Sequence, residues 1–598
     1  MKFFRVVRNS SLTLLFLMAL ESSSRAAIVT DLRPSETSPS PLGTVVRWTA
    51  NATDNNSGSL WYRFSAGPAG GDVQVIKDFS SSNRVDWTTI DSEGTYVIQV
   101  DIRNQSTGEV SSVSSPYELL PLAGQGPVIS PTQNPLVFIY SAPPCPSGGM
   151  MKVNFSRAPG DGRVQTTPSQ PCRSTTMNFY LAGMRANTDY LAEHLITYAT
   201  SRTTAGPLMR FTTGGVPAAI TSLSAANQQV LQTSFSATND WILLQGPLGL
   251  PPFATDLNGN IIWYYPQALS FLTRPTPNGL LFGINNTGAD SSRSVLRIFD
   301  LAGNTVQETN AAAVNMQLAA MGKRPIGVFH HEARRLPDGN IATLATVEQI
   351  LTNVQGPGPV DVIGDMIIIL DQNFRVLWTW DAFDYLDVTR KAILGETCSN
   401  SGACMSHFLA VDGNDWTHAN AVQQTPDGNL LLSLRHQDWV VKLDYENGRG
   451  DGHILWHLGN AGDFTIQSDD PNPWFSHQHD ANFLADNVTL ELFDNGNTRK
   501  AADPNANSRG QVLVVDEENR TVRLLLNQNL AVYSAAVGSA QRLTNGDYHF
   551  DAGFIGRSAI SFELTRTGSI KRAIQAGAPE YRTFRLPDLY SGLINAYR

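Results

Sequence analysis

The sequence has few charged residues and no basic excess. Asp, Glu, Lys and Arg make up 16% of its 598 residues, and the formal net charge is −10 at pH 7. Low charge content together with 48 glycines and 33 prolines is typical of a turn-rich globular β protein rather than a disordered chain. The negative charge argues against a nucleic-acid partner, which requires a basic surface. A small anionic substrate is not excluded, because one arginine can hold it.

Long hydrophobic runs are also absent, except for a short one at the start. A basic stretch from Lys2 to Arg8 precedes the apolar segment Ser11–Leu20, and Ser24-Arg25-Ala26 offers small residues at both cleavage-specifying positions. The alternative is a membrane anchor, but about ten apolar residues are too few for a span that needs about 20. We therefore expect residues 1–26 to be a signal peptide. The mature protein, beginning near Ala27, should be periplasmic or secreted, without a membrane span.

Cysteine is scarce, with four in the whole chain. Cys398 and Cys404 flank a short Ser/Asn/Gly loop, and Cys145 and Cys172 bracket a segment rich in proline and glycine. Two local disulfides are the simplest expectation in an oxidising compartment. Zinc is the alternative, but neither pair has the short spacing of a zinc site.

A chain of this length exceeds a single core, so two or three domains are expected. Residues 28–120 contain short alternating strands with frequent turn clusters, which predict an immunoglobulin-like sandwich. Its large aromatic residues are expected in the core rather than on a ligand platform: Trp48, Trp61, Trp87 and Tyr96. Pro121–Pro127 suits a linker. A second sandwich is predicted over residues 125–215, where the run 181–190 resembles a strand-turn-strand corner of fibronectin type III modules.

From about residue 225 the sequence repeats two turn signatures. The first is a hairpin turn, found at Pro277-Asn278-Gly279, Pro337–Asn340, Pro426–Asn429, Ala485–Asn487 and Thr544–Asp547. The second occurs six times, at Asp256–Trp263, Asp300–Val306, Asp371–Trp378, Asp444–Trp456, Asp516–Val522 and Thr565–Ile570. Repeats of about four strands each predict a six-bladed β-propeller over residues 225–598. A long β-helix is the alternative, although its coils are shorter and more regular.

Polar residues recur at fixed places before the hairpin turns. His331, Asn420 and His479 each stand six residues before the first residue of a turn, and His418 and His477 lie two residues further upstream. In a propeller the inner strands start around a central channel, so these side chains should converge. One alternative is that such histidines are hydrogen-bonding staples between blades.

The stretch around His418 also supplies a cation. His418 and Asn420 are two residues apart and should point the same way on a strand. Arg435 follows the next predicted strand, Leu430–Leu434, and can return beside them. A neutral base, an amide and a fixed cation suit an oxygen-rich anion. A metal site is disfavoured, since Asn420 is a poor transition-metal ligand and Arg435 would repel a cation.

Several ordered segments resemble the bacterial arylsulfate sulfotransferase family, over about residues 225–598. They are Phe329-His330-His331-Glu332 ahead of Leu336–Asn340, Asp415-Trp416-Thr417-His418-Ala419-Asn420, Arg435-His436-Gln437, His477-Gln478-His479-Asp480-Ala481, and the tail Tyr581–Tyr590. The resemblance implies a propeller that moves a sulfuryl group from a phenolic sulfate ester to a phenol, without a nucleotide donor or other cofactor. The chain departs from the family at its N-terminal end, where one small sandwich is usual and two are predicted here. It also places the Cys398–Cys404 loop ahead of the Trp416–Asn420 segment.

The resemblance also implies roles for individual residues. His479 matches the nucleophile that becomes a transient sulfohistidine, and His331 a second histidine of the site, with His330 as the fallback if the register is off by one. His418, Asn420 and Arg435 match groups that hold the sulfuryl oxygens. His330, His436 and His477 are expected to contribute to substrate binding.

The chemistry is consistent with these roles. Sulfuryl transfer needs in-line attack and stabilised oxygens, as phosphoryl transfer does, and a second histidine can act as acid and base. Two alternatives remain open: a hydrolase that passes the group to water, and a non-catalytic adhesin. The sequence does not decide between a monomer and a homodimer.

Overall fold

The computed structural model describes residues 29–159, 163–223, 226–233, 239–286, 290–401, 404 and 408–593. The predicted signal peptide lies outside them. Strands account for most of the regular secondary structure in the described chain and helices are few and short, which confirms the all-β class. Its longest helix is α2 (Ala311–Ala320). In the described segments no helix has the length and apolar character needed to cross a bilayer.

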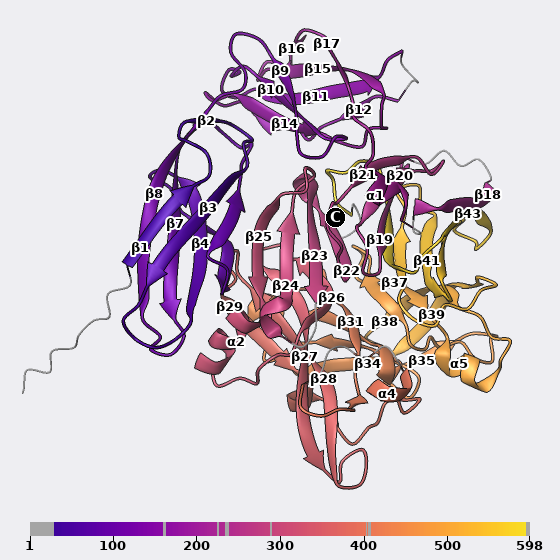
Figure 1. The fold of residues 1–598 in the computed structure, drawn as a ribbon. Coiled ribbons are helices and arrows are strands. Elements are labelled where there is room, and N and C mark those ends of the chain that lie inside the picture. Colours follow the sequence, from indigo (N-terminus) through magenta and orange to yellow (C-terminus); the bar gives the residue numbers. More distant parts are fainter. Residues whose placement is uncertain are drawn as a thin grey trace, which may run out of the picture.

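The N-terminal unit, indigo in Figure 1, consists of two packed sheets. One sheet contains β1 (Val29–Pro34), β3 (Val46–Thr53) and β6 (Arg84–Trp87); the other contains β2 (Ser40–Pro41), β8 (Val110–Leu120), β7 (Gly94–Asn104), β4 (Leu60–Pro68) and β5 (Gln74–Ser80). Trp48, Trp87 and Tyr96 are buried in the core that both sheets share, as predicted. Trp61 is partly exposed instead, because the alternation along β4 buries its neighbours Tyr62 and Phe64.

A second pair of sheets follows, purple in Figure 1. One contains β9 (Val128–Pro131), β10 (Phe138–Ala142) and β14 (Met177–Leu181); the other contains β11 (Met150–Arg157), β12 (Gln165–Thr166), β13 (Gln170–Pro171), β15 (Asp189–Thr197), β16 (Thr203–Ala205) and β17 (Met209–Thr212). The sulfur atoms of Cys145 and Cys172 lie at disulfide-bonding distance within this core. Those of Cys398 and Cys404 do so in a later loop, so both predicted pairs are found.

The remaining described strands form six groups of four or five strands, which we call sheets, although the second is continuous with a sheet of the N-terminal unit. In each of these sheets the strand named first is called its first strand. They are β44 (Glu580–Leu586), β19 (Ile242–Pro247), β20 (Phe253–Asp256) and β21 (Ile261–Tyr264); β22 (Phe271–Thr276), β23 (Leu280–Asn286), β24 (Ser294–Phe299) and β25 (Thr305–Asn310); β26 (Phe329–Arg335), β27 (Ile341–Thr352), β28 (Pro359–Leu370) and β29 (Val376–Asp381), with β30 (Asn414–Asp415); β31 (Ala419–Gln424), β32 (Leu430–Leu434), β33 (Trp439–Leu443) and β34 (Ile454–Gly459); β36 (His479–Phe483), β37 (Thr489–Asp494), β38 (Arg509–Asp516) and β39 (Thr521–Asn529), with β35 (Thr465–Gln467); and β40 (Ser539–Arg542), β41 (Tyr548–Ile555), β42 (Ser558–Leu564) and β43 (Ile570–Ala576), with β18 (Gln228–Thr233).

The short helices lie in the connections between these strands. They are α1 (Ala218–Thr221), η2 (Pro277–Gly279), η3 (Ser291–Arg293), α3 (Ala382–Tyr385), α4 (Cys398–Ser401), η4 (Arg435–Gln437), η5 (Glu446–Gly448) and α5 (Asn497–Ala502).

Both repeated turn signatures have fixed places in these sheets. The five hairpin turns connect the first and second strands of five sheets, and the six copies of the second signature connect the third and fourth strands of all six. The aspartate that opens the second signature accepts backbone N–H groups of its own turn, as Asp256 does from Asn258 and Asp371 does from Asn373. The sheet without a hairpin-turn copy starts with β44, which comes from the far end of the chain.

The six first strands contact one another in sequence. β22 contacts β26, β26 contacts β31, β31 contacts β36, β36 contacts β40, β40 contacts β44, and β44 contacts β22. Five hydrophobic clusters each join two neighbouring sheets. Apolar side chains therefore pack neighbouring sheets against each other, and the first strands form a closed series of contacts.

The N-terminal unit is attached to the second of these sheets. β5 pairs in parallel with β25, Gln307 Nε2 donates to the Val75 carbonyl over 2.8 Å, and Thr309 Oγ1 donates to Asp78 over 2.8 Å. The strands β2, β8, β7, β4 and β5 therefore continue into β25, β24, β23 and β22 as one nine-stranded sheet.

Candidate active site

A β-bulge interrupts three neighbouring first strands. The pairing register shifts after His330 in β26, after Ala419 in β31 and after His479 in β36. His331, His418 and Asp480 beside these shifts have positive φ values of 52°, 47° and 55°. Non-glycine residues rarely adopt such a conformation, and it often marks a functional site. The regular alternation expected for His418 and Asn420 does not hold here, because the bulge redirects the side chains.

The bulges gather six histidines, which we call the histidine cluster: His330, His331, His418, His436, His477 and His479. Ring centroids lie 5.0 Å apart for His331 and His418, and 6.3 Å apart for His331 and His479. His331 and His479 are each 2% exposed and His418 is 7% exposed. These histidine rings therefore lie close together, and the three side chains are almost fully buried.

Three members lie close to oxygen atoms outside the cluster, although the contact of His330 Nε2 with Asp365 lacks hydrogen-bond geometry. His330 Nε2 lies 2.9 Å from Asp365, and His436 Nδ1 lies 2.6 Å from the Asp415 carbonyl oxygen. His477 lies between two carboxylates, with Nδ1 2.8 Å from Asp438 and Nε2 2.5 Å from Glu396. Burial alone would lower the pKa of His477, but Asp438 and Glu396 raise it. His477 is thus held on both ring nitrogens, which suits a structural role.

His331, His418 and His479 are held only through Nδ1. His479 Nδ1 lies 2.7 Å from Asn495 Oδ1, His418 Nδ1 lies 2.7 Å from Asp415, and His331 Nδ1 lies 3.0 Å from His330 Nδ1. No hydrogen bond to their Nε2 atoms is found within the described residues.

The partner of His479 fixes its tautomer. The Asn495 amide nitrogen donates to the Ser534 and Val537 carbonyls, so its oxygen is the atom that faces His479. Since that oxygen can only accept, Nδ1 of His479 carries the proton and Nε2 keeps a lone pair.

Burial lowers the pKa of three cluster members. The pKa of His331 is well below its usual value because of burial and the neighbouring histidines, and that of His479 because of burial and Arg435. Burial, His418 and Arg435 do the same for His436. These imidazoles are neutral at neutral pH.

Arg435 is a cation that contacts the histidine cluster at His436. Nη1 donates to His436 Nε2, and Nη2 donates to the Ala535 carbonyl over 3.0 Å. Burial lowers its pKa, yet a guanidinium remains charged. Within the described structure its Nε is buried without a hydrogen-bond partner. Such a donor is costly unless a ligand satisfies it.

Asn420 connects two of the bulged strands. Its Nδ2 donates to the Gln478 carbonyl over 2.7 Å, and its Oδ1 accepts from the Asp480 N–H over 3.3 Å. One amide hydrogen is left for a ligand. Asn420 therefore positions β31 against β36, in addition to any contact with substrate.

A second buried group, which we call the ionic cluster, consists of Arg274, Glu332, Asp480 and Arg582. Arg274 donates to Glu332 over 2.9 Å and also to Asp480. Arg582 donates to Glu332 over 3.0 Å and lies 3.6 Å from Asp480. Glu332 and Asp480 follow His331 and His479 directly in sequence, so the two clusters are adjacent.

Two sets of buried ligand atoms have the spacing of a metal site: Glu396 with His436 and His477, and Asp415 with His418 and His436. Both sets share His436, whose Nε2 accepts from Arg435 and whose Nδ1 contacts the Asp415 carbonyl. Neither nitrogen is open, and Arg435 repels a cation there. The residues present therefore do not suit a metal.

Sequence reasoning identified the histidines but assigned no role to the residues that hold them. Asp415 had a signal, since it stands three residues before His418 in the same motif. Asp438 had one too, since it directly follows Arg435-His436-Gln437. Asn495 and Glu396 had none, because they reach the cluster from another strand end and a loop.

Comparison with known proteins adds a family match. Residues 233–581, more than half of the chain, match the arylsulfotransferase (ASST) family. The arylsulfate sulfotransferase AssT of Lelliottia amnigena is 27% identical over 28% of this chain, and the match spans 35% of that relative.

Similar solved structures include the chicken interferon gamma receptor alpha chain (11% identity, 31% of this chain and 100% of that chain, TM-score 0.13) and a two-domain fibronectin type III segment of chicken tenascin (14%, 31% and 99%, TM-score 0.15). These TM-scores are too low to support an argument about the fold.

Proposed function

Because the chain belongs to the arylsulfotransferase family, we propose that it transfers a sulfuryl group from a phenolic sulfate ester to a phenolic acceptor. The name of the Lelliottia amnigena relative supports this reaction. The observation that carries the proposal is the pairing of His479 with Asn495 beside Arg435. It gives a neutral imidazole with a free Nε2 lone pair next to an unpaired buried guanidinium N–H.

We propose residues 225–598 as a six-bladed propeller, with an immunoglobulin-like sandwich at 28–120 and a fibronectin-like one at 125–215. This architecture is supported by the six sheets, by the closed series of contacts among their first strands, and by the two turn signatures that recur from sheet to sheet. Export to the periplasm or beyond is supported by two cysteine pairs at bonding distance.

In the first half-reaction, Nε2 of His479 attacks the sulfur atom of the donor. A nitrogen–sulfur bond forms as the bond from sulfur to the phenolic oxygen breaks, and the oxygen leaves with a proton from a second histidine. In the second half-reaction, the acceptor phenol returns a proton to that histidine while its oxygen attacks sulfur and the nitrogen–sulfur bond breaks. One pocket can therefore serve donor and acceptor in turn.

His418 is the best candidate for the proton-transfer role. Asp415 accepts its Nδ1–H, and a carboxylate stabilises the positive charge that an imidazole acquires with a second proton. His479 is bonded to a neutral amide instead, which leaves it as nucleophile. His331, whose ring centroid lies 5.0 Å from that of His418, is assigned to donate a hydrogen bond, rather than a proton, to the leaving oxygen.

Arg435 and Asn420 are assigned to the sulfuryl oxygens. The unpaired Nε–H of Arg435 and the second amide hydrogen of Asn420 are donors held in place by other contacts. Preorganised donors of this kind stabilise charge in the transition state. The near-complete burial of His331 and His479 favours a phenol over water as acceptor, which argues for transfer rather than hydrolysis.

Wild-type protein should be mixed rapidly with an aryl sulfate in the absence of acceptor. A burst of about one phenol per protein and a mass gain of one sulfuryl group are expected, with peptide mapping to the segment containing His479. Sulfation of His418 or His331 would reassign the nucleophile. Kinetics that require donor and acceptor to bind together, with no adduct, would exclude the two-step mechanism.

A further inference from the structure

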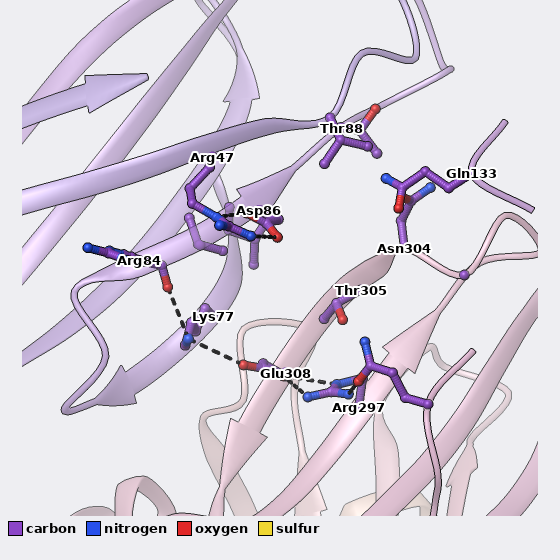
Figure 2. A pocket seen from close by; sticks show the side chains of 15 residues that line it. Arg47, Lys77, Arg84, Asp86, Thr88, Gln133, Arg297, Asn304, Thr305 and Glu308 are labelled. Atoms are coloured by element: carbon purple, nitrogen blue, oxygen red, sulfur yellow. Dashed lines mark hydrogen bonds and ion pairs between the residues drawn. The ribbon is translucent and has the colours of Figure 1, made fainter. Parts of the chain in front are cut away.

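A polar cleft lies between the N-terminal unit and the sheet of β22–β25, and none of its lining residues belongs to the histidine cluster. It encloses about 410 Å³. Figure 2 shows β5 and β6 of the N-terminal unit on one side and β24 and β25 on the other, with Gln133 entering from the segment after β9. The pairing of β5 with β25 fixes its two walls against each other.

Cations outnumber carboxylates in the cleft. Its charged side chains are Arg47, Lys77, Arg84, Arg297, Asp86 and Glu308. Arg47 bonds Asp86 through two contacts of 2.7 and 2.8 Å, and Arg297 bonds Glu308 over 2.9 Å. Lys77 lies 3.7 Å from Glu308. The guanidinium of Arg84 has no hydrogen bond or ion pair within the described residues, although its backbone carbonyl accepts from Lys77.

Neutral hydrogen-bonding groups line the rest of the cleft. They are Thr88, Gln133, Gln267, Asn304 and Thr305. The apolar lining is aliphatic: Val45, Ile76 and Val85. The lining therefore offers no aromatic face on which a phenyl ring would stack.

We propose that this cleft binds an anionic saccharide. Its volume lies in the range of small-molecule sites and far exceeds an inorganic anion. Guanidinium groups recognise carboxylate or sulfate, while amide and hydroxyl side chains match sugar hydroxyls, since both can donate and accept. Arg84, which lacks a carboxylate partner, is the first candidate to bind the anionic group, and Gln133 and Asn304 are candidates to bind ring hydroxyls.

The experiment uses the full chain and size-matched probes in calorimetric titration. A carboxylated trisaccharide (trigalacturonate) and a sulfated carrageenan tetrasaccharide are the anionic arms, and maltotriose is the neutral one. The anionic probes should bind at least tenfold more tightly than maltotriose, and added salt should weaken them. The tighter of the two anionic probes identifies the natural anionic group.

Two variants locate the site. Arg84→Gln should weaken anionic binding about tenfold, the effect of losing one charge-assisted hydrogen bond. Arg293→Gln removes the same charge from an exposed arginine outside the cleft and should leave binding unchanged. Both should retain wild-type turnover of an aryl sulfate, which separates this site from the proposed active site.

Four results would overturn the proposal: no binding of either anionic saccharide at millimolar concentration, equal binding of maltotriose, equal loss in both variants, or tighter binding of a hexaglutamate peptide. The last would identify an acidic peptide as the ligand instead.

Discussion

The histidine cluster and the ionic cluster occupy neighbouring positions on the same strands and handle burial in opposite ways. In β26 His331 precedes Glu332, and in β36 His479 precedes Asp480. All four side chains are at most 2% exposed. Each carboxylate is paired with two arginines, whereas the contacts of the two histidines include no carboxylate.

The two clusters differ because burial shifts the pKa of a side chain toward its neutral form unless an oppositely charged partner is close. Burial disfavours charge, so imidazoles without a carboxylate become neutral, which a nucleophile requires. Burial would also raise the pKa of Asp480, but Arg274, Arg582 and Arg334 lower it. The ionic cluster thereby joins β22, β26, β36 and β44. In β26 and in β36, therefore, the histidine serves the proposed chemistry, and the carboxylate that follows it holds the strands together.

The largest effect should come from His479→Asn. Transfer should fall roughly 10⁴-fold or more, because no other group in the proposed mechanism can form the covalent intermediate. Folding should persist, since Asn keeps a polar side chain near Asn495. Steady-state transfer and thermal unfolding measure the two effects. His453→Asn, at an exposed histidine, is the matched control, and equal activity in both variants would refute the role of His479.

The next largest should come from Glu332→Gln in the ionic cluster. Removing one carboxylate leaves Arg274 and Arg582 with only Asp480, which should cost about 3 kcal/mol of unfolding free energy. Denaturant titration measures it. Asp86→Asn breaks the exposed pair with Arg47 and should cost less than about 1 kcal/mol. Similar costs at both sites would mean that the ionic cluster does not fix the strands.

A smaller effect is expected for Arg435→Lys, which keeps the charge but loses the planar fork. Turnover should fall about 10²-fold, consistent with the loss of one preorganised donor, while unfolding is little changed. Full turnover in this variant would remove Arg435 from the site.

The smallest effect concerns Glu491, which lies near the ionic cluster and has one buried carboxyl oxygen, Oε2, without a hydrogen-bond partner within the described residues. Burial, reinforced by Asp480, raises its pKa to about 8. Between the unfolded value near 4.3 and about 8, the unfolded state releases this proton and the folded state keeps it, so stability falls as pH rises.

Glu491→Gln should flatten that fall, so that its stability relative to wild type is greater at pH 8 than at pH 5. Denaturant titrations at pH 5 and pH 8 test it. Parallel pH profiles for variant and wild type would show that Glu491 ionises normally in the folded protein.

Much of the repeat architecture could be predicted because its signal is local. Turns need glycine, asparagine and aspartate at fixed offsets, so Pro426–Asn429 and its counterparts mark the same connection in each sheet. The convergence of His331, His418 and His479 followed from their distance to those turns. The sheet that starts with β44 has no hairpin-turn signature, because β44 lies far from β19 in sequence and no turn connects the two strands.

The supporting contacts could not be predicted for physical reasons. Asn495 follows β37 and reaches His479 across a hairpin, and Glu396 reaches His477 from a loop 81 residues earlier in the chain. Neither of these distances along the chain follows the period of a strand or of the repeats, so no sequence pattern indicates the contacts. The bulges that turn His418 and Asn420 differently depend on three-dimensional pairing, which alternation alone does not reveal.

The position of β44 has a consequence for the order in which the protein matures during synthesis. Arg585 in β44 bonds Asp240, 345 residues earlier, and the same strand supplies Arg582 to the ionic cluster and Tyr581, whose hydroxyl donates to the His331 carbonyl over 2.5 Å. A ribosome releases these residues only after the three bulged strands have been made. Contacts of such long range also form slowly. The histidines should therefore remain imperfectly arranged in a nascent chain, and reactivity should appear only when the last strand is in place.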